Sequence, residues 1–271
     1  MTTDSTQLLA RPDGRIAYDV AGDGPLVVLV PGMGDLRATY RFLAPALRDA
    51  GYRVAVTDLR GHGDSETTFT SYGDAETGGD VLALIEALGG PAVVVGNSMG
   101  AGAAVYAAAE RPDLVSGLVL VGPFVRDTAT AVQKLLVRIA MARPWAGAMW
   151  KMYLPKLYAG RVPADQDAYL AQVSAAMEQP GHTAAFARLV AQLDHDVAED
   201  RLEAVRAPSL VVMGELDPDF PDPKAEAAWI AGRIGSQVTM VAEAGHYPQS
   251  QRPDLVTPAV LHFLAQVNAR A

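Results

Sequence analysis

Short runs of aliphatic and β-branched residues recur along the chain, and each run is apolar at successive positions rather than at alternate ones. The clearest are Leu26–Val30, Val54–Val56, Ala92–Val95, Leu118–Val121 and Leu210–Met213. A strand with two apolar faces is typical of a parallel sheet that helices cover on both sides. The runs therefore predict the buried strands of such a sheet, with a last strand at Gln237–Val241.

Helical patterns alternate with these strands. They lie at Tyr40–Ala50, Gly79–Leu88, Met99–Glu110, Pro223–Ile234 and Pro253–Asn268. Parallel strands need crossover connections, which helices supply. The alternation predicts an α/β protein with a doubly wound, mostly parallel sheet. Asp13-Gly14 is a hairpin signal, so we expect a small antiparallel pair to precede the sheet.

The alternation stops between Pro123 and Pro208, where four helical patterns follow one another, separated by prolines. An insertion of this length between two strands predicts an all-helical cap over the carboxyl ends of the strands, where open α/β sheets bind ligands. We therefore predict a core of residues 1–122 and 208–271 and a cap of residues 123–207.

Composition and charge narrow the functional classes. The chain has 271 residues, of which 50% are apolar, and this is typical of a single globular domain. Its net charge of -9 argues against nucleic acid and anionic membranes as partners. The basic cap residues Lys134, Arg138, Arg143 and Lys151 suggest membrane contact, but with this net charge we expect a solvated face. We therefore expect no membrane partner.

The chain has no cysteine, so disulfides, thiolate nucleophiles and cysteine-bound metals are excluded. No N-terminal stretch has the pattern of a signal peptide, and no apolar run approaches the roughly 20 residues of a membrane span. We expect a cytoplasmic protein without a cofactor or a metal. The oligomeric state is not predicted.

The strongest chemical signal is Gly96-Asn97-Ser98-Met99-Gly100, which follows one predicted strand and precedes a predicted helix. A strand that reverses into a helix at one residue strains the backbone there, and glycines on both sides prevent clashes. The turn would expose the Ser98 hydroxyl beside the helix N-terminus, with the Met99 N–H directed at a developing oxyanion. The same glycines resemble a dinucleotide-binding spacing, but that fingerprint follows the first strand of a sheet, and no Tyr-x-x-x-Lys pair is present.

Three further motifs follow strand ends. Pro31-Gly32-Met33-Gly34-Asp35 would bring the Met33 N–H to the same oxyanion as a second donor. Asp217 follows the strand Leu210–Met213 and is the candidate acid that orients an imidazole, with Asp219 and Glu215 as alternatives. His246 follows the last strand in a Gly-His-Tyr-Pro loop and is the candidate base. The chain order Ser98, Asp217, His246 is that of one known convergent triad.

The other histidines have simpler interpretations. His62 lies in a polar loop in which we expect Asp58 and Arg60 to form an ion pair. His195, between Asp194 and Asp196, is expected at a solvated helix end rather than in a metal site. His182 and His262 are interpreted as ordinary cap and surface-helix residues.

Aromatic and sulfur side chains are frequent in the cap and first predict its own core. Some of them should still line a pocket above Ser98 and select a small hydrophobic substrate. The candidate substrate-binding residues are Phe124, Trp145, Trp150 and Tyr153.

Taken together, these motifs resemble the α/β-hydrolase superfamily, in its capped branch of esterases, lactonases and C–C bond hydrolases. The resemblance covers nearly the whole chain and implies Ser98 as nucleophile, His246 as base and Asp217 as acid, with the Met33 and Met99 N–H groups as oxyanion donors. Pro31 departs from the histidine usual at that position, which leaves open what anchors the loop. Members with aspartate at the nucleophile position attack haloalkanes or epoxides, and Ser98 excludes that likeness.

The function predicted from these residues is hydrolysis of a carboxylic ester of a small hydrophobic substrate through an acyl-enzyme. The same triad is compatible with lactone opening, C–C bond cleavage or cofactor-free perhydrolysis. A capped pocket is also compatible with a ligand-sensing signalling protein that turns over slowly.

Overall fold

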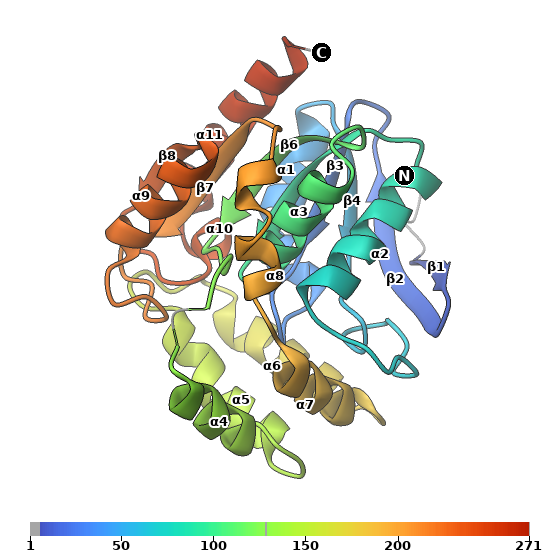
Figure 1. The fold of residues 1–271 in the computed structure, drawn as a ribbon, viewed down its shortest axis with the longest axis vertical. Coiled ribbons are helices and arrows are strands. Elements are labelled where there is room, and N and C mark those ends of the chain that lie inside the picture. The colour runs from blue at the N-terminus through green and yellow to red at the C-terminus, as the bar shows by residue number, and fades with distance from the viewer. Residues whose placement is uncertain (1–5, 128, 271) are drawn as a thin grey trace.

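The computed structural model describes residues 6–127 and 129–270, and a single mixed sheet forms its centre (Figure 1). The strand order is β1-β2-β4-β3-β5-β6-β7-β8, with β1–β2 and β2–β4 antiparallel and the other pairs parallel. The strands are β1 (Gln7–Arg11), β2 (Gly14–Ala21), β3 (Leu26–Val30), β4 (Arg53–Thr57), β5 (Ala92–Asn97), β6 (Val115–Val121), β7 (Ser209–Gly214) and β8 (Gln237–Val241). The predicted opening hairpin and parallel sheet are confirmed.

Helices cover both faces of the sheet because successive side chains of each strand point to opposite sides. Val28 and Val30 of β3 face a cluster that includes α2 (Asp74–Ala87), α3 (Met99–Glu110) and α9 (Pro223–Ile234). Val27 and Leu29 face α1 (Leu43–Asp49) and α11 (Pro253–Asn268) on the other side. Both faces are therefore buried, as the apolar runs predict.

Most predicted elements are found where expected. Helices α3, α9 and α11 have the predicted bounds, whereas α2 begins at Asp74 rather than at Gly79. Gly78 suits close packing on α3, since a Cβ there would lie 2.6 Å from the Tyr106 ring. The predicted helix Tyr40–Ala50 is divided into the 3-10 turn η1 (Arg37–Tyr40) and α1.

The inserted segment forms helices at the carboxyl edge of the sheet, drawn below it in Figure 1. They are α4 (Ala131–Ala140), α5 (Ala146–Tyr153), η2 (Leu154–Leu157), α6 (Gln166–Met177) and α7 (His182–Gln192). Trp150, Tyr169, Val173 and Phe186 belong to a separate apolar cluster among these helices. The segment is thus helical and has its own core, as expected of a cap. The boundaries at residues 123 and 207 remain a prediction.

Three short elements complete the chain. Helix α8 (Asp196–Glu199) and the 3-10 turn η3 (Leu202–Ala204) contribute Ala198 and Leu202 to the core cluster of the sheet rather than to the cap cluster. Helix α10 (Pro248–Gln251) precedes α11. Among the described residues, no helix has the length and apolar character needed to cross a membrane.

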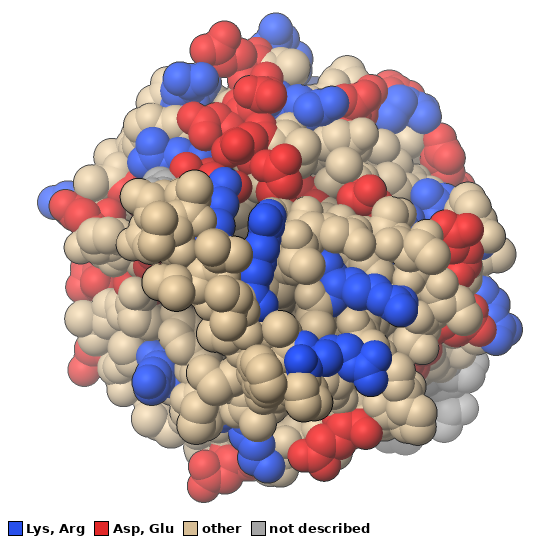
Figure 2. All heavy atoms as spheres, turned by 60° about the horizontal axis from the view of Figure 1, so that its bottom comes forward, with Lys and Arg blue, Asp and Glu red and all other residues tan. Residues whose placement is uncertain are grey.

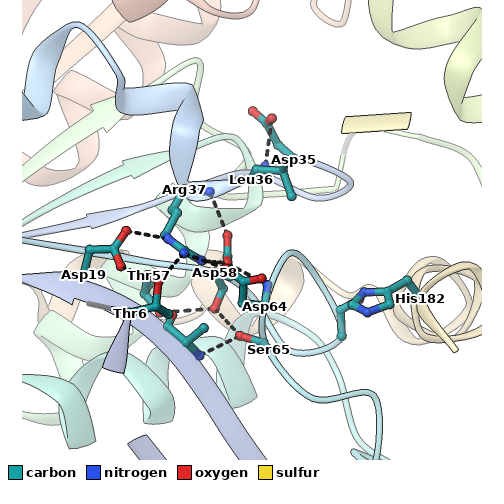
Figure 3. Close-up of polar contacts among 12 residues, drawn as sticks. Thr6, Asp19, Asp35, Leu36, Arg37, Thr57, Asp58, Asp64, Ser65 and His182 are labelled. Carbon is teal, nitrogen blue, oxygen red and sulfur yellow. Dashed lines mark hydrogen bonds and ion pairs between the residues drawn. The ribbon is translucent and has the colours of Figure 1, made fainter. Parts of the chain in front are cut away.

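An ion-pair network around Arg37 joins the loop after β3 to the loop after β4 (Figure 3). The Arg37 guanidinium pairs with Asp58. It also pairs with Asp19 and with Asp64, at 2.6 Å in both cases. The backbone N–H of Arg37 donates to Asp58 Oδ1 at 2.8 Å. Asp58 is buried, and burial raises the pKa of its carboxyl although Arg37 opposes the rise.

The prediction of an ion pair between Asp58 and Arg60 is wrong. The Arg60 guanidinium instead binds both oxygens of Asp80 on α2, at 2.6 and 2.8 Å. Asp58 is occupied by Arg37, which is distant from the Asp58–Ser65 motif in sequence. Each arginine therefore fixes a different side of this loop.

We predict that Arg37→Met lowers the free energy of unfolding by about 3 kcal/mol at pH 8, because it leaves the buried Asp58 carboxylate without its cation. The pKa of Asp58 is raised in the folded state, so protonation at lower pH relieves the penalty, and the loss should be smaller at pH 5. Urea unfolding followed by circular dichroism at both pH values measures this. Arg37→Met/Asp58→Asn should recover part of the loss; an equal loss at both pH values would contradict the account.

Candidate active site

Ser98 lies at the junction of β5 and α3 in a left-handed backbone conformation, with φ 57° and ψ −125°. The junction tolerates only glycine two residues before and two residues after Ser98. A Cβ at Gly96 would lie 2.1 Å from the Gly100 carbonyl oxygen, and one at Gly100 would lie 2.6 Å from the Pro31 oxygen. The strained turn inferred from the motif is thus present, and Ser98 is half-buried rather than enclosed.

His246 and Asp217 form a buried hydrogen-bonded pair. The Nδ1 atom of His246 lies 2.8 Å from Asp217 Oδ2, and the two residues are 1% and 2% exposed. Asp219 is more distant, at 3.8 Å from the same nitrogen, and Glu215 is exposed. Of the three candidate acids, Asp217 is therefore the one bonded to the imidazole.

Contacts at the strand ends hold this pair beside Ser98. The side chain of Asn97, which precedes Ser98, donates to the backbone oxygen of His246 at 3.2 Å. The N–H of Phe124 donates to the backbone carbonyl oxygen of Ser98 at 3.3 Å. The Phe124 ring contacts the His246 ring edge to face, with centroids 5.8 Å apart. Among the described residues the Ser98 hydroxyl has no hydrogen-bond partner, His246 included. Such bonds are often longer before a substrate binds.

The electrostatic surroundings of His246 favour its charged form. Burial lowers the pKa of the imidazole, but the carboxylates of Asp217, Asp219 and Asp35 outweigh burial and raise it to about 9. An imidazole with this partner is well suited to accept a proton and to hold it as the imidazolium.

Two backbone N–H groups are free beside Ser98. Gly32 packs so closely that a Cβ there would lie 2.8 Å from the Ser98 Cβ, which places the loop after β3 against the serine. Within the described residues, neither the Met33 N–H nor the Met99 N–H has an acceptor. Free donors at these positions can bind an oxyanion.

The loop after β3 is anchored without the histidine that Pro31 replaces. Trp150 Nε1 donates to the Gly34 oxygen at 2.8 Å, and the Gly34 N–H donates to His62 Nε2 at 3.0 Å. The His62 Nδ1 atom lies 2.8 Å from the Arg60 oxygen, so the neutral tautomer with its proton on Nδ1 satisfies both contacts. Burial keeps His62 neutral by lowering its pKa to about 4. Trp150 thus binds the carbonyl oxygen of Gly34, and His62 binds its N–H.

Asp35, at the end of the same loop, is a polar residue whose role the motif alone does not reveal. Its carboxyl is fully buried, accepts from the Leu36 N–H at 2.9 Å and from the Tyr169 hydroxyl, and burial raises its pKa to about 6. Its second oxygen and the Tyr158 hydroxyl have no partner among the described residues. Tyr169 lies on α6, so this contact joins the loop to the cap.

His195 is not at a solvated helix end, and that expectation is wrong. It is buried, and its Nδ1 atom lies 2.8 Å from Asp74 Oδ2 at the start of α2. Its ring stacks on Phe124, with centroids 5.4 Å apart. His182 is also buried, with Nδ1 3.0 Å from the Gly61 oxygen, whereas His262 is exposed on α11.

The four candidate substrate-binding aromatics have different surroundings. Phe124 contacts His246, and Trp150 is buried beneath the loop after β3. The Tyr153 hydroxyl donates to Asp219, next to Asp217. Trp145 is 49% exposed, and its indole N–H donates to the Ile139 oxygen at 3.0 Å, so it packs on α4 rather than at Ser98.

Two groups of side chains have the spacing of metal ligands. Asp217, Asp219 and His246 form one, but the 2.8 Å between Asp217 and His246 is the length of a direct hydrogen bond. Asp127, Asp194 and Asp196 form the other, and the Lys134 ammonium lies 2.8 Å from Asp127. In each group one carboxylate is therefore already bonded to a basic side chain.

Comparison with known proteins agrees with this fold. The model of the "Alpha/beta hydrolase family" matches residues 27–259, and the chain belongs to this family. It is 29% identical to a 2-(acetamidomethylene)succinate hydrolase of Mesorhizobium japonicum over 93% of this chain and 92% of that protein. It is 28% identical to a 2-hydroxy-6-oxo-6-phenylhexa-2,4-dienoate hydrolase of Comamonas testosteroni, over 94% and 92%.

A solved structure, a thermophilic esterase from Thermogutta terrifontis, superposes with a TM-score of 0.82 at 25% identity, over 97% of this chain and 99% of that one. The predicted fold class and superfamily are confirmed, and these relatives support a hydrolase activity.

We predict that the pKa values of two buried histidines are shifted in opposite directions from the usual value near 6.5. His62 should stay neutral until pH falls to about 4, while His246 should remain protonated well above pH 7. Nitrogen NMR of histidine-labelled protein measures both. In Asp217→Asn the pKa of His246 should fall and that of His62 should not change. Titration of both residues near 6.5 would contradict the geometry.

Proposed function

We propose that this protein is a serine hydrolase that cleaves a carboxylic ester of a small hydrophobic substrate through an acyl-enzyme. His246 accepts the proton of the Ser98 hydroxyl as Ser98 attacks the ester carbonyl, and the alcohol leaves with that proton. Water then enters, His246 takes a proton from it, and the resulting attack releases the carboxylic acid and restores Ser98. Asp217 keeps the imidazole in the reactive tautomer and stabilises its charged form.

The Met33 and Met99 N–H groups are the proposed oxyanion donors. Both are free within the described residues, and the Gly32 contact with Ser98 supports their proximity to the nucleophile. A donor that is already oriented needs no reorganisation when the negative charge develops, and each is typically worth about 3–4 kcal/mol of transition-state stabilisation. The anchoring of Gly34 by Trp150 and His62 supports this preorganisation.

The observation that carries the proposal is the buried bond between His246 and Asp217 next to a strained, half-buried serine. A histidine with a purely structural role in the core would not require a serine in a strained turn beside it. The surroundings of His246 are apolar. Its ring contacts that of Phe124, and the ring centroid of Phe220 lies 4.9 Å from that of Phe124. These aromatic rings support a hydrophobic substrate. The named relatives act on several bonds, and the esterase structure supports the ester among them.

We predict that the protein hydrolyses short-chain p-nitrophenyl esters and that Ser98→Ala reduces kcat to background. In Asp217→Asn, kcat should fall by about 10⁴-fold, as expected when the base loses its correct tautomer. Activity of the wild type should fall as pH falls through the raised pKa of His246, because the imidazolium cannot accept a proton. Asp217→Asn should move this acid limb to lower pH, since the carboxylate that favours the imidazolium is gone.

Asp219→Asn is the matched control, because Asp219 lies 3.8 Å from the same imidazole nitrogen without being its hydrogen-bond partner. It should lose far less activity than Asp217→Asn. Equal losses in the two variants, or a Ser98→Ala variant as active as the wild type across the ester series, would refute the assigned roles.

A further inference from the structure

Helix α4 is amphipathic, but its apolar side faces away from the protein. Val132, Leu135, Leu136 and Ile139 share one side of the helix at the spacing of one turn, and they are between 54% and 67% exposed. No residue of the helix is buried. On the other side, the Lys134 ammonium faces the protein and binds Asp127 at 2.8 Å. This orientation is the reverse of that of a helix that packs on a core.

The segment that contains this apolar side is rich in basic residues. From Ala129 to Ala164 the chain contains six basic residues and no acidic one, although the whole chain has 31 Asp and Glu. The basic residues are Lys134, Arg138, Arg143, Lys151, Lys156 and Arg161. Figure 2 shows the cap end of the molecule: uncharged and basic side chains occupy much of the centre, and acidic ones gather toward the upper edge.

Few of these cations are neutralised by neighbours. Lys134 pairs with Asp127, and Lys151 lies 4.0 Å from Glu178. Within the described part of the chain, the side chains of Arg138, Arg143 and Lys156 have no acidic partner. The surface therefore combines exposed aliphatic side chains with unpaired positive charge.

Trp145 adds an aromatic residue at the end of this surface. It is 49% exposed, and its indole N–H is hydrogen-bonded to the Ile139 oxygen, so the ring is held against α4. Met152, at the end of the neighbouring helix α5, is exposed as well. Tryptophan is favoured at membrane interfaces because one part of the ring is apolar while its N–H is polar.

We propose that α4 and Trp145 dock the cap onto an anionic lipid bilayer. Ten residues of helix extend about 15 Å, too short to span a membrane but sufficient to lie within its interface with the apolar side inward. The unpaired arginines and lysines would then meet lipid phosphates. This association does not depend on the proposed hydrolase chemistry.

The net charge of -9 does not oppose this docking as strongly as the sequence suggests. At physiological ionic strength, charges are screened over about 8 Å, so a bilayer responds to the surface that approaches it rather than to the whole chain. The acid-free segment forms part of the cap, and on the face drawn in Figure 2 the acidic side chains lie mainly toward the edges.

A second copy of the chain fits this surface less well. In a two-fold symmetric dimer the same patch meets itself, so unpaired cations would face unpaired cations. A bilayer that contains anionic lipids supplies both an apolar interior and negative charge. Charge complementarity therefore favours the lipid surface.

The test is flotation of the full chain with vesicles of phosphatidylcholine and phosphatidylglycerol in equal parts, compared with phosphatidylcholine alone. The wild type should bind the anionic vesicles, bind neutral ones much more weakly, and dissociate as salt is raised. Arg138→Ala/Arg143→Ala should weaken binding about thirtyfold, since each cation near an anionic surface contributes roughly a factor of five. Leu135→Glu/Ile139→Glu should abolish it.

Val238→Glu is the control, since Val238 is an exposed aliphatic residue (42%) on edge strand β8 and should not affect binding. All variants should retain the far-UV circular dichroism of the wild type. Quenching of Trp145 fluorescence by brominated lipid should accompany binding, because the other two tryptophans are at least half-buried. Ser98→Ala should bind as the wild type does, which separates this proposal from the catalytic one.

Three outcomes would overturn the proposal. One is no flotation with anionic vesicles, and another is equal binding to neutral vesicles. The third is a dimer in light scattering that Leu135→Glu/Ile139→Glu converts to a monomer, which would assign the face to a second copy.

Discussion

The turn at Ser98 is the constraint on which the arrangement of the site depends. A strand that changes into a helix at one residue leaves room only for glycine two positions before and after it, and the close approaches at Gly96 and Gly100 show how little space remains. Because the turn stands at the carboxyl edge of a parallel sheet, the loops after β3, β6, β7 and β8 reach it from both sides. The contacts of Gly32, Phe124 and Asn97 follow from that convergence.

The cap and the core are joined by polar contacts as well as by packing. Trp150 of α5 holds Gly34, and Tyr169 of α6 holds Asp35, so two cap helices are bonded to the loop that carries the Met33 N–H. The Arg37 network holds the segment that follows this loop from the core side. A change in the cap can therefore affect the proposed oxyanion donors without contact with Ser98.

Local sequence signals predicted much of the fold and the candidate site. The bounds of strand β3 and of helices α3, α9 and α11 could be predicted. Apolar runs, prolines at helix starts and glycine turns are local signals, because each depends on only a few neighbouring residues. Ser98, Asp217 and His246 could be chosen because each follows a strand end in a known order. Long-range partners could not be predicted: the Asp74 that binds His195 is 121 residues away, and the Arg37 that binds Asp58 is 21 residues away. Periodicity also showed that α4 is amphipathic without showing which side faces outward.

Whether Ser98 is an activated nucleophile can be measured by its reaction with an organic fluorophosphonate. We expect intact-protein mass spectrometry to detect one phosphonyl adduct per chain and peptide mapping to place it on Ser98. His246→Ala should greatly slow its formation. An adduct on a different residue, or full ester turnover by a protein that the reagent does not modify, would contradict this expectation.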